Sequence, residues 1–193
     1  PVCSSAASDV YKRQGHHGKT VVSHDLKTAK GKAWLQDTLA HTDVLLQNMK
    51  WGDLDTMGLM PDQLSDAFPR LVHVRLVGFE QHPERLAYDV VVQAESGFMS
   101  MNGTPDGLAT KMPVAMMDIL ASHQMRAAVL GGLFQRERMG RGGYGEVSLW
   151  GSGLTALANQ GTQWLMQGQV PQRMGSAHPN IAPYGDVLSL IHI

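Results

Sequence analysis

The sequence predicts an α/β domain with a mainly parallel sheet, and three observations support this. Short apolar runs rich in β-branched residues recur along the chain, as is typical of buried strands. Longer segments with helical spacing separate them, and such alternation indicates βαβ units. The chain has 193 residues, 43% hydrophobic and 17% charged, so it is long enough to bury one core.

The first predicted elements are a helix at 27–40 and a strand at 43–47. The helix places Trp34 and Leu39 on one apolar stripe. The strand is a short apolar run, and we expect it to end in a loop at 48–52, as a parallel strand does.

The middle of the chain predicts a further strand and two helices. Residues 71–79 form a β-branched run that Gly78 closes. Helices are expected at roughly 88–101 and 114–139, and Gly140 is placed where a glycine ends a helix. The second helix contains Gly131–Gly132, which weakens it by about 1 kcal/mol per glycine relative to alanine. We therefore expect a helix or another stretch of backbone to approach closely at these two glycines, either within the chain or across a dimer.

A last strand and a last helix are predicted at 145–150 and roughly 153–167. The preceding run, Gly140–Val147, matches the pattern G-x-G-x-x-G-x-V of the protein kinase glycine loop. Here it follows a helix and precedes a strand, whereas a dinucleotide site needs a helix N-terminus after the loop. We interpret it as a helix stop and a tight turn.

The two ends of the chain differ from its interior. Residues 1–14 and 188–193 have no helical or strand period, and both resemble translated adaptor sequence. We therefore expect residues 15–187 to be a partial domain that lacks portions at both ends. The single cysteine, Cys3, excludes an intramolecular disulfide and favours a reducing compartment, so a cytoplasmic location is expected.

The composition argues against several classes of partner. The net charge of −1 provides no basic surface for nucleic acid or for an anionic membrane. No apolar run approaches the length of a membrane-spanning helix. The nine histidines lack the paired spacing of metal ligands and have no accompanying thiolates, so no metal is expected.

Asp118 is the most informative single residue. It is the only acidic residue between Asp106 and Glu137, in a stretch that otherwise predicts a buried helix rich in methionine and alanine. A carboxylate is costly to bury without a partner, so such a residue has either a partner or a chemical role. Three interpretations are open: a helix N-cap, a satisfied core acid, or a catalytic carboxylate.

Ten segments, taken in order, resemble the family III CoA-transferases, the group that contains formyl-CoA and carnitine-CoA transferases. They include a Tyr-Asp pair, a P-D-G turn, the aspartate and an E-R-x-G-x-G hairpin, and together they span essentially all of 19–187. The matching segments are Asp25–Lys27, Asp43–Val44, Asn48, Met57–Leu59, Tyr88–Gly97, Met101–Gly107, Met112–Asp118, Arg136–Gly142, Pro171–Gly175 and His178–Tyr184.

The resemblance implies that Asp118 is a nucleophile. In this family the matching carboxylate attacks an acyl-CoA thioester to give a mixed anhydride, and CoA then returns to form an aspartyl-CoA thioester. A second carboxylic acid finally collects the CoA. The chemistry is consistent with the residue type, because a carboxylate with a pKa of roughly 3.9 is ionised at neutral pH and needs no activating base.

The resemblance also implies which residues bind coenzyme A. Asn48 is a polar residue at the carboxyl end of a strand, where α/β proteins bind ligands. Lys50 and Arg85 are candidate phosphate or pantetheine contacts, with solvated surface charge as the alternative. The remaining candidates are Tyr88 and Asp89, at the family's paired position beside the active site, and Gly175 and His178, in the segment expected to stabilise the oxyanion.

Two alternatives use the same resemblance. The α-methylacyl-CoA racemases have a His-Asp pair where this chain has Tyr88-Asp89, and their histidine works with the aspartate as a two-base system. A phenol with a pKa of about 10 is a poor replacement for that histidine, so transfer is favoured over racemisation. The third interpretation is an inactive CoA-binding homologue, which an Asp118–arginine pair in a closed core would support.

The fold implied by the resemblance is a Rossmann-like large domain, incomplete here. Full-length relatives also have a smaller domain, and two subunits pass through each other as interlocked rings, so a homodimer is expected of the full-length protein. The missing portions would leave sheet edges and helix faces uncovered, so we expect residues 15–187 alone to be inactive and marginally stable.

Overall fold

The computed structural model describes residues 15–82 and 84–181, which fall into two units, Pro1–Thr38 and Leu39–Ile193. The predicted ends at 1–14 and 188–193 therefore lie outside the described residues, as does Tyr184. In the first unit Thr28 begins helix α2 (Ala29–Ala40), because its Oγ1 accepts a hydrogen bond from Gly31 N at 3.1 Å.

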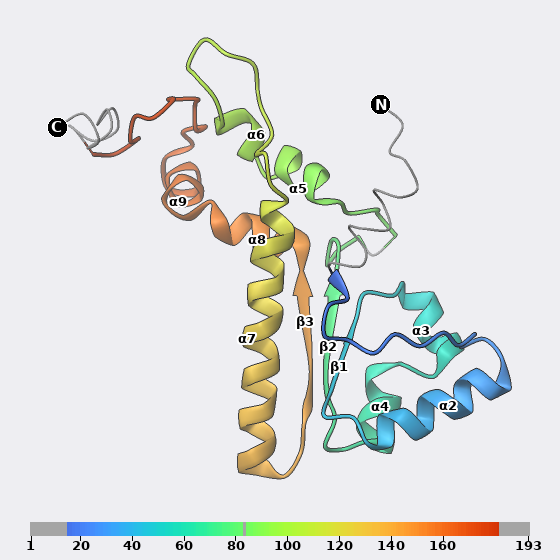
Figure 1. Cartoon of the computed structure of the whole chain (residues 1–193). Coiled ribbons are helices and arrows are strands. Elements are labelled where there is room, and N and C mark those ends of the chain that lie inside the picture. Colours follow the sequence, from blue (N-terminus) through green and yellow to red (C-terminus); the bar gives the residue numbers. More distant parts are fainter. Residues whose placement is uncertain (1–14, 83, 182–193) are drawn as a thin grey trace. The chain divides into compact units, whose positions relative to one another are not determined.

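The second unit contains the predicted parallel sheet. Its strands are β1 (Val44–Gln47), β2 (Val72–Val77) and β3 (Gly143–Ser148), in the order β1-β2-β3 with both pairs parallel. Val72 lies opposite Val44 on one side and opposite Gly143 on the other. The prediction of a parallel α/β arrangement is confirmed, and Figure 1 shows the three strands side by side.

Helix α7 (Met116–Met139) covers one face of this sheet (Figure 1). A Cβ added at Gly132 would lie 2.5 Å from Val72 Cγ1, so the predicted close approach is confirmed at this glycine. Gly131 has no atom of the described residues within 4 Å of such a position, so no approach occurs there within the chain, and an approach across a dimer stays a prediction. The apolar core consists of Val72, Val74, Phe79, Val92, Met117, Ala121, Val147 and Leu149.

Most of α7 lies at the surface, against the prediction of a buried helix. Met117 and Ala121 are its buried residues, whereas Leu130 and Phe134 are 60% and 65% exposed. Helix α7 packs against β2, β3, α5 and α8, and the exposure of Leu130 and Phe134 shows that the described residues leave part of its apolar surface uncovered. Composition alone could not reveal this, because apolar residues occur on both sides.

The other face of the sheet is polar and carries His73, Arg75, Tyr144 and Glu146. Two short helices that the sequence analysis missed follow β1: α3 (Trp51–Met57) and α4 (Pro61–Ala67). The predicted loop at 48–52 is therefore wrong from Trp51 onward.

The boundaries of these two helices have local causes. Gly58 ends α3 in the left-handed conformation with φ 72°, and Pro61 occupies the first turn of α4. Each helix has only seven residues, which is too short for a helical period to stand out.

The predicted helix at 88–101 is two helices, α5 (Asp89–Glu95) and α6 (Phe98–Met101). Gly97 separates them because its φ of 89° is left-handed, a conformation that glycine adopts readily. The chain then passes through a loop to α7.

The last strand is shifted from its predicted position, because β3 ends at Ser148 and not at 150. Ser148 caps α8 (Leu149–Ala156) directly, with Gly151 N donating to its Oγ at 2.8 Å, and α9 (Ala158–Gln167) follows. Gly140 does end α7, with φ 73° and its N–H donating to Arg136 O. The predicted tight turn after Gly140 is short, because β3 already begins at Gly143 and includes Gly145.

Candidate active site

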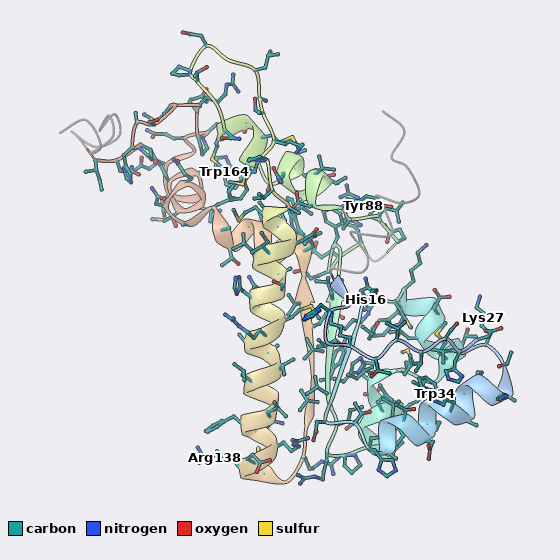
Figure 2. The ribbon with its side chains drawn as sticks, viewed as in Figure 1. His16, Lys27, Trp34, Tyr88, Arg138 and Trp164 are labelled. Carbon is teal, nitrogen blue, oxygen red and sulfur yellow. The ribbon has the colours of Figure 1, made fainter. Side chains whose placement is uncertain are left out.

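A pocket of about 360 Å³ opens at the carboxyl ends of β1 and β2. Five of the predicted site residues line it: Asn48, Lys50, Arg85, Tyr88 and Asp118. They come from the segment after β1, the segment before α5 and the first turn of α7. Figure 2 shows Tyr88 at the start of α5. This edge of a parallel sheet is where open α/β proteins bind ligands.

Asp118 is the third residue of α7, and its side chain is exposed. Among the described residues its carboxylate has no hydrogen-bond or ion-pair partner. It is therefore neither the helix N-cap, which is Ala115, nor a satisfied core acid. Partial desolvation raises the pKa of Asp118, and the negative charge of Asp89 raises that pKa further.

Asp89 caps the helix that carries Asp118. Its Oδ1 accepts hydrogen bonds from Met117 N at 2.6 Å and Asp118 N at 3.4 Å. Ala115, the N-cap residue, has no side-chain acceptor, so Asp89 supplies the cap from a different helix. Asp89 does not line the pocket, and its carboxylate instead contacts the backbone N–H groups of Met117 and Asp118.

The backbone N–H groups of residues 116–119 all have acceptors. Met116 N donates to Val114 O, and Ile119 N donates to Ala115 O at 3.1 Å. Met117 N and Asp118 N donate to Asp89. Residues 116–119 therefore offer no spare backbone donor for an anion, and an oxyanion in the pocket needs other donors.

Met117 fixes the direction of the Asp118 side chain by packing on the opposite side. It is fully buried, and a Cβ added at Gly153 of α8 would lie 3.2 Å from Met117 Sδ and 2.8 Å from Val92 Cγ1. Three helices thus meet at this methionine, and the next residue points into the pocket.

The two predicted basic contacts differ in availability. Lys50 is exposed, and no hydrogen bond or ion pair to its ammonium group occurs among the described residues. Arg85 already pairs with Glu95 and lies over the Phe79 ring at 4.2 Å. Of these two candidates, Lys50 is the one that can meet a phosphate without breaking an ion pair to another described residue.

Arg75 also lines the pocket, and sequence analysis missed it. It is 5% exposed, pairs with Glu146 at 3.0 Å and donates to Met49 O at 3.1 Å. Burial and the Arg75 charge lower the pKa of His73 to about 4. The signal was present in the strand sequence, where His73 and Arg75 alternate with valines and so share one face.

Gly175 and His178 do not line the pocket with Asp118. Gly175 adopts a φ of 59°, and its N–H donates to Gly103 O at 3.0 Å. His178 Nδ1 accepts a hydrogen bond from Asn180 N, and the ring borders a separate hollow beside α9. Their predicted role at the oxyanion stays a prediction.

Two further properties concern the described residues. They include no group of three or more histidine, cysteine, aspartate or glutamate side chains placed to hold a metal ion. None of the described helices combines the length and the apolar character that crossing a membrane requires.

Comparison with known proteins gives consistent results. The model of CoA-transferase family III matches residues 2–187. The chain is 35% identical over 180 residues to succinate–glutarate CoA-transferase of Agrobacterium fabrum, covering 92% of this chain and 45% of that protein. It is 31% identical over 176 residues to acetyl-CoA:oxalate CoA-transferase of Acetobacter aceti, covering 88% of this chain and 44% of that protein.

A solved structure agrees with this. The CAIB/BAIF family protein from Brucella suis superposes with a TM-score of 0.80 at 35% identity, covering 87% of this chain and 45% of that chain. The chain thus spans less than half the length of these relatives.

Proposed function

The chain belongs to CoA-transferase family III, and from this we propose that the whole protein transfers coenzyme A from an acyl-CoA thioester to a carboxylic acid through Asp118. The observation that carries the proposal is the Asp118 carboxylate, exposed and without a described partner in a pocket at the carboxyl edge of the sheet. The donor and acceptor acids are not specified by the residues of this pocket.

The proposed reaction consists of four acyl substitutions. An Asp118 oxygen attacks the thioester carbonyl, the C–S bond breaks, and CoA thiolate leaves behind a mixed anhydride. The thiolate attacks the Asp118 carbonyl carbon, which releases the donor acid as a carboxylate and leaves an aspartyl-CoA thioester. The acceptor carboxylate repeats the first two steps in reverse order, so acceptor-CoA forms and Asp118 is again a carboxylate.

The surroundings of Asp118 support a nucleophilic role. A raised pKa makes a carboxylate more basic and therefore more nucleophilic while it remains ionised. None of the four substitutions requires a proton to be added or removed, so Asp118 needs no general base to activate it. Charge must instead be stabilised on the oxyanion and on the thiolate.

We assign binding roles to the candidates by their availability. Asn48 and Lys50 supply an amide and an unpaired cation on the pocket wall, and they suit the oxyanion, thiolate or phosphates. Arg85 can contact a phosphate only after it leaves Glu95, and Tyr88 borders the pantetheine path. Asp89 holds the first turn of α7, which carries Asp118. Gly175 and His178 would close over the intermediate. No metal takes part in the proposed steps.

The proposal extends to the rest of the protein. Residues 15–187 are the interior of a large domain, completed in the full-length protein by further chain and by a second copy in a homodimer. That protein acts on acyl-CoA and carboxylic acids in the cytoplasm, without nucleic acid or membrane.

The test uses the complete reading frame that contains this chain. The protein is incubated with a panel of acyl-CoA donors, and intact mass spectrometry measures covalent CoA on the wild type and on Asp118→Ala. Asp66→Ala, an exposed aspartate of α4, is the matched control. An adduct on the wild type and the control but absent from Asp118→Ala supports the proposal. An adduct that survives in Asp118→Ala contradicts it.

A second candidate function rests on Tyr88, which borders the same pocket as Asp118. A 2-methylacyl-CoA racemase needs two proton-transfer groups on one pocket, and here the second group would be the Tyr88 phenol, a poorer base than the histidine of those racemases. Exchange of the α-hydrogen for deuterium in a 2-methylacyl-CoA, without CoA transfer to any acid, would favour this function.

A further inference from the structure

Gln93 of α5 is a buried polar side chain with an unusual set of partners. It is 1% exposed, yet its amide makes hydrogen bonds in three directions. Its Nε2 donates to Asp89 Oδ2 and to Val114 O at 3.3 Å, and its Oε1 accepts from Met112 N at 2.7 Å. Gln93 therefore joins α5 to the segment that leads into α7.

The bond to Asp89 continues to the site. One oxygen of Asp89 meets the Gln93 amide, and the other accepts from the backbone of Met117 and Asp118. The chain of contacts runs from Gln93 through Asp89 to the first turn of α7. Because a carboxylate with both oxygens engaged cannot rotate freely, the amide fixes the orientation of the cap.

We propose that Gln93 is a positioning residue for the transfer reaction: it holds Asp89 against the first turn of α7 and thereby fixes where Asp118 lies in the pocket. The catalytic consequence rests on the proposed function, whereas the positioning itself does not. An amide suits this task because it donates to Asp89 while adding no charge beside two carboxylates.

The ionisable groups around Gln93 and Asp89 determine how a new charge at position 93 would act. Asp89 on α5 accepts directly from Gln93, and Asp118 on α7, whose backbone N–H donates to Asp89, opens into the pocket. The ionisable residues that line the same pocket are Lys50, Arg75, Glu84, Arg85 and Tyr88. Arg75 and Arg85 are already paired with Glu146 and Glu95, so neither compensates a new charge at position 93.

The informative substitution is Gln93→Glu, which keeps the shape and the acceptor for Met112 N but gives up the donor to Val114 O. At low pH the introduced acid is protonated and can donate to Asp89 as the amide does. As the pH rises the new carboxylate ionises and repels Asp89. We expect kcat to fall by about tenfold or more across that transition, with KM for acyl-CoA unchanged within about twofold.

The matched control is the double variant Asp89→Asn/Gln93→Glu. It exchanges donor and acceptor between the two positions, so the side-chain hydrogen bond re-forms without two adjacent carboxylates. The new asparagine oxygen can still accept from Met117 N. We expect kcat at the higher pH to recover most of the loss seen in Gln93→Glu.

A second measurement needs no turnover. Carboxyl carbon NMR titration gives the pKa of Asp118 in each variant. Relative to the wild type, we expect the pKa of Asp118 to rise in Gln93→Glu, which adds a negative charge. We expect it to fall in the double variant, which moves the charge from position 89 to position 93, away from Asp118. Should Gln93→Glu not fold, the double variant alone decides the question.

The outcomes separate the two proposals. If Asp118 titrates as expected in the variants but the wild type transfers no CoA, the proposed function fails and the positioning role stands. If CoA is transferred, but both the pH profile of kcat and the titration of Asp118 are unchanged, the positioning role is overturned. A loss of kcat that matches only the unfolded fraction, measured by thermal unfolding, overturns it as well.

Discussion

Charged side chains at the carboxyl edge of the sheet and on its polar face differ in burial and in whether they have an ion-pair partner. At the edge, Asp118 is exposed and has no partner among the described residues. On the polar face, Arg75 is 5% exposed and pairs with Glu146 at 3.0 Å. The comparison teaches that the surroundings decide the role: a compensated charge stabilises the scaffold, and an uncompensated one remains reactive.

The largest expected effect comes from removing the buried Arg75. Arg75→Met removes the two hydrogen bonds that its guanidinium donates, to the exposed Glu146 and to Met49 O. We expect the free energy of unfolding at pH 7 to fall by about 3 kcal/mol, because hydrogen bonds from a charged group contribute about 1.5 to 3 kcal/mol each. Urea unfolding measures it.

The control for this prediction is Arg75→Met/Glu146→Leu, which removes both charges. It should recover little of the loss, because Glu146 is exposed and keeps its hydrogen bond from Tyr144 in the single variant. A single-variant loss below about 1 kcal/mol would contradict a structural role for the pair.

The next effect concerns pH and His73. Burial and the Arg75 charge hold the pKa of His73 in the folded state at about 4, below the ordinary 6.5. As the pH falls, the imidazole is therefore protonated in the unfolded state before it is protonated in the folded state. The stability that this provides is present above pH 6.5 and is lost as the pH falls towards 4. We expect a loss of about 2 to 3 kcal/mol over this window from this residue.

Denaturant unfolding at a series of pH values checks this, with His73→Gln as the comparison. The variant should lose less stability between pH 6.5 and 4 than the wild type does. Parallel losses in the two proteins would show that other groups cause the acid sensitivity.

A smaller effect is expected at the edge of the sheet. Lys50→Ala removes the unpaired cation of the pocket wall, so KM for acyl-CoA should rise by about tenfold with little change in kcat. Steady-state kinetics on the complete protein measures it. Lys30→Ala, an exposed lysine of α2, is the control and should leave both constants unchanged. An equal effect of the two substitutions would place Lys50 outside the binding site.

The smallest effect is on stability at Asp118. Its raised pKa means that the folded state binds the proton more tightly, so the ionised form destabilises the fold above the ordinary pKa of 3.8. Asp118→Asn should therefore be more stable at pH 7, by no more than about 0.5 kcal/mol since the group is exposed. The gain should vanish below pH 3.8. A clear loss at pH 7 would mean that Asp118 has a structural partner.

Much of the sheet could be predicted because β-branched runs identify buried strands. The carboxyl ends of parallel strands meet at one edge, so Asn48 and Lys50 could be placed in one site with the Asp118 that the resemblance identified. The helices α3 and α4 could not be predicted from the sequence, because seven residues show too little of a helical period.

The partners of individual side chains were also beyond prediction from sequence. Gln93 lies in a helix rich in valine, and nothing in its sequence position indicates contacts 19 and 21 residues away. Asp89 was expected beside the ligand, but its oxygens face the backbone of α7. Such contacts depend on how two helices pack, which local patterns do not determine.

The adjacency of Met117 and Asp118 limits how the sequence can change in length. Successive residues of a helix differ by about 100° in direction, so inserting one residue between Val114 and Met117 would turn Met117 towards the pocket and carry Asp118 to the direction that Ile119 now has. Gln93 contacts Met112 and Val114 and so anchors the segment before the helix. We expect homologous chains to vary in length around Asp106, in the exposed loop, and to keep the interval from Met112 to Asp118 free of insertions and deletions.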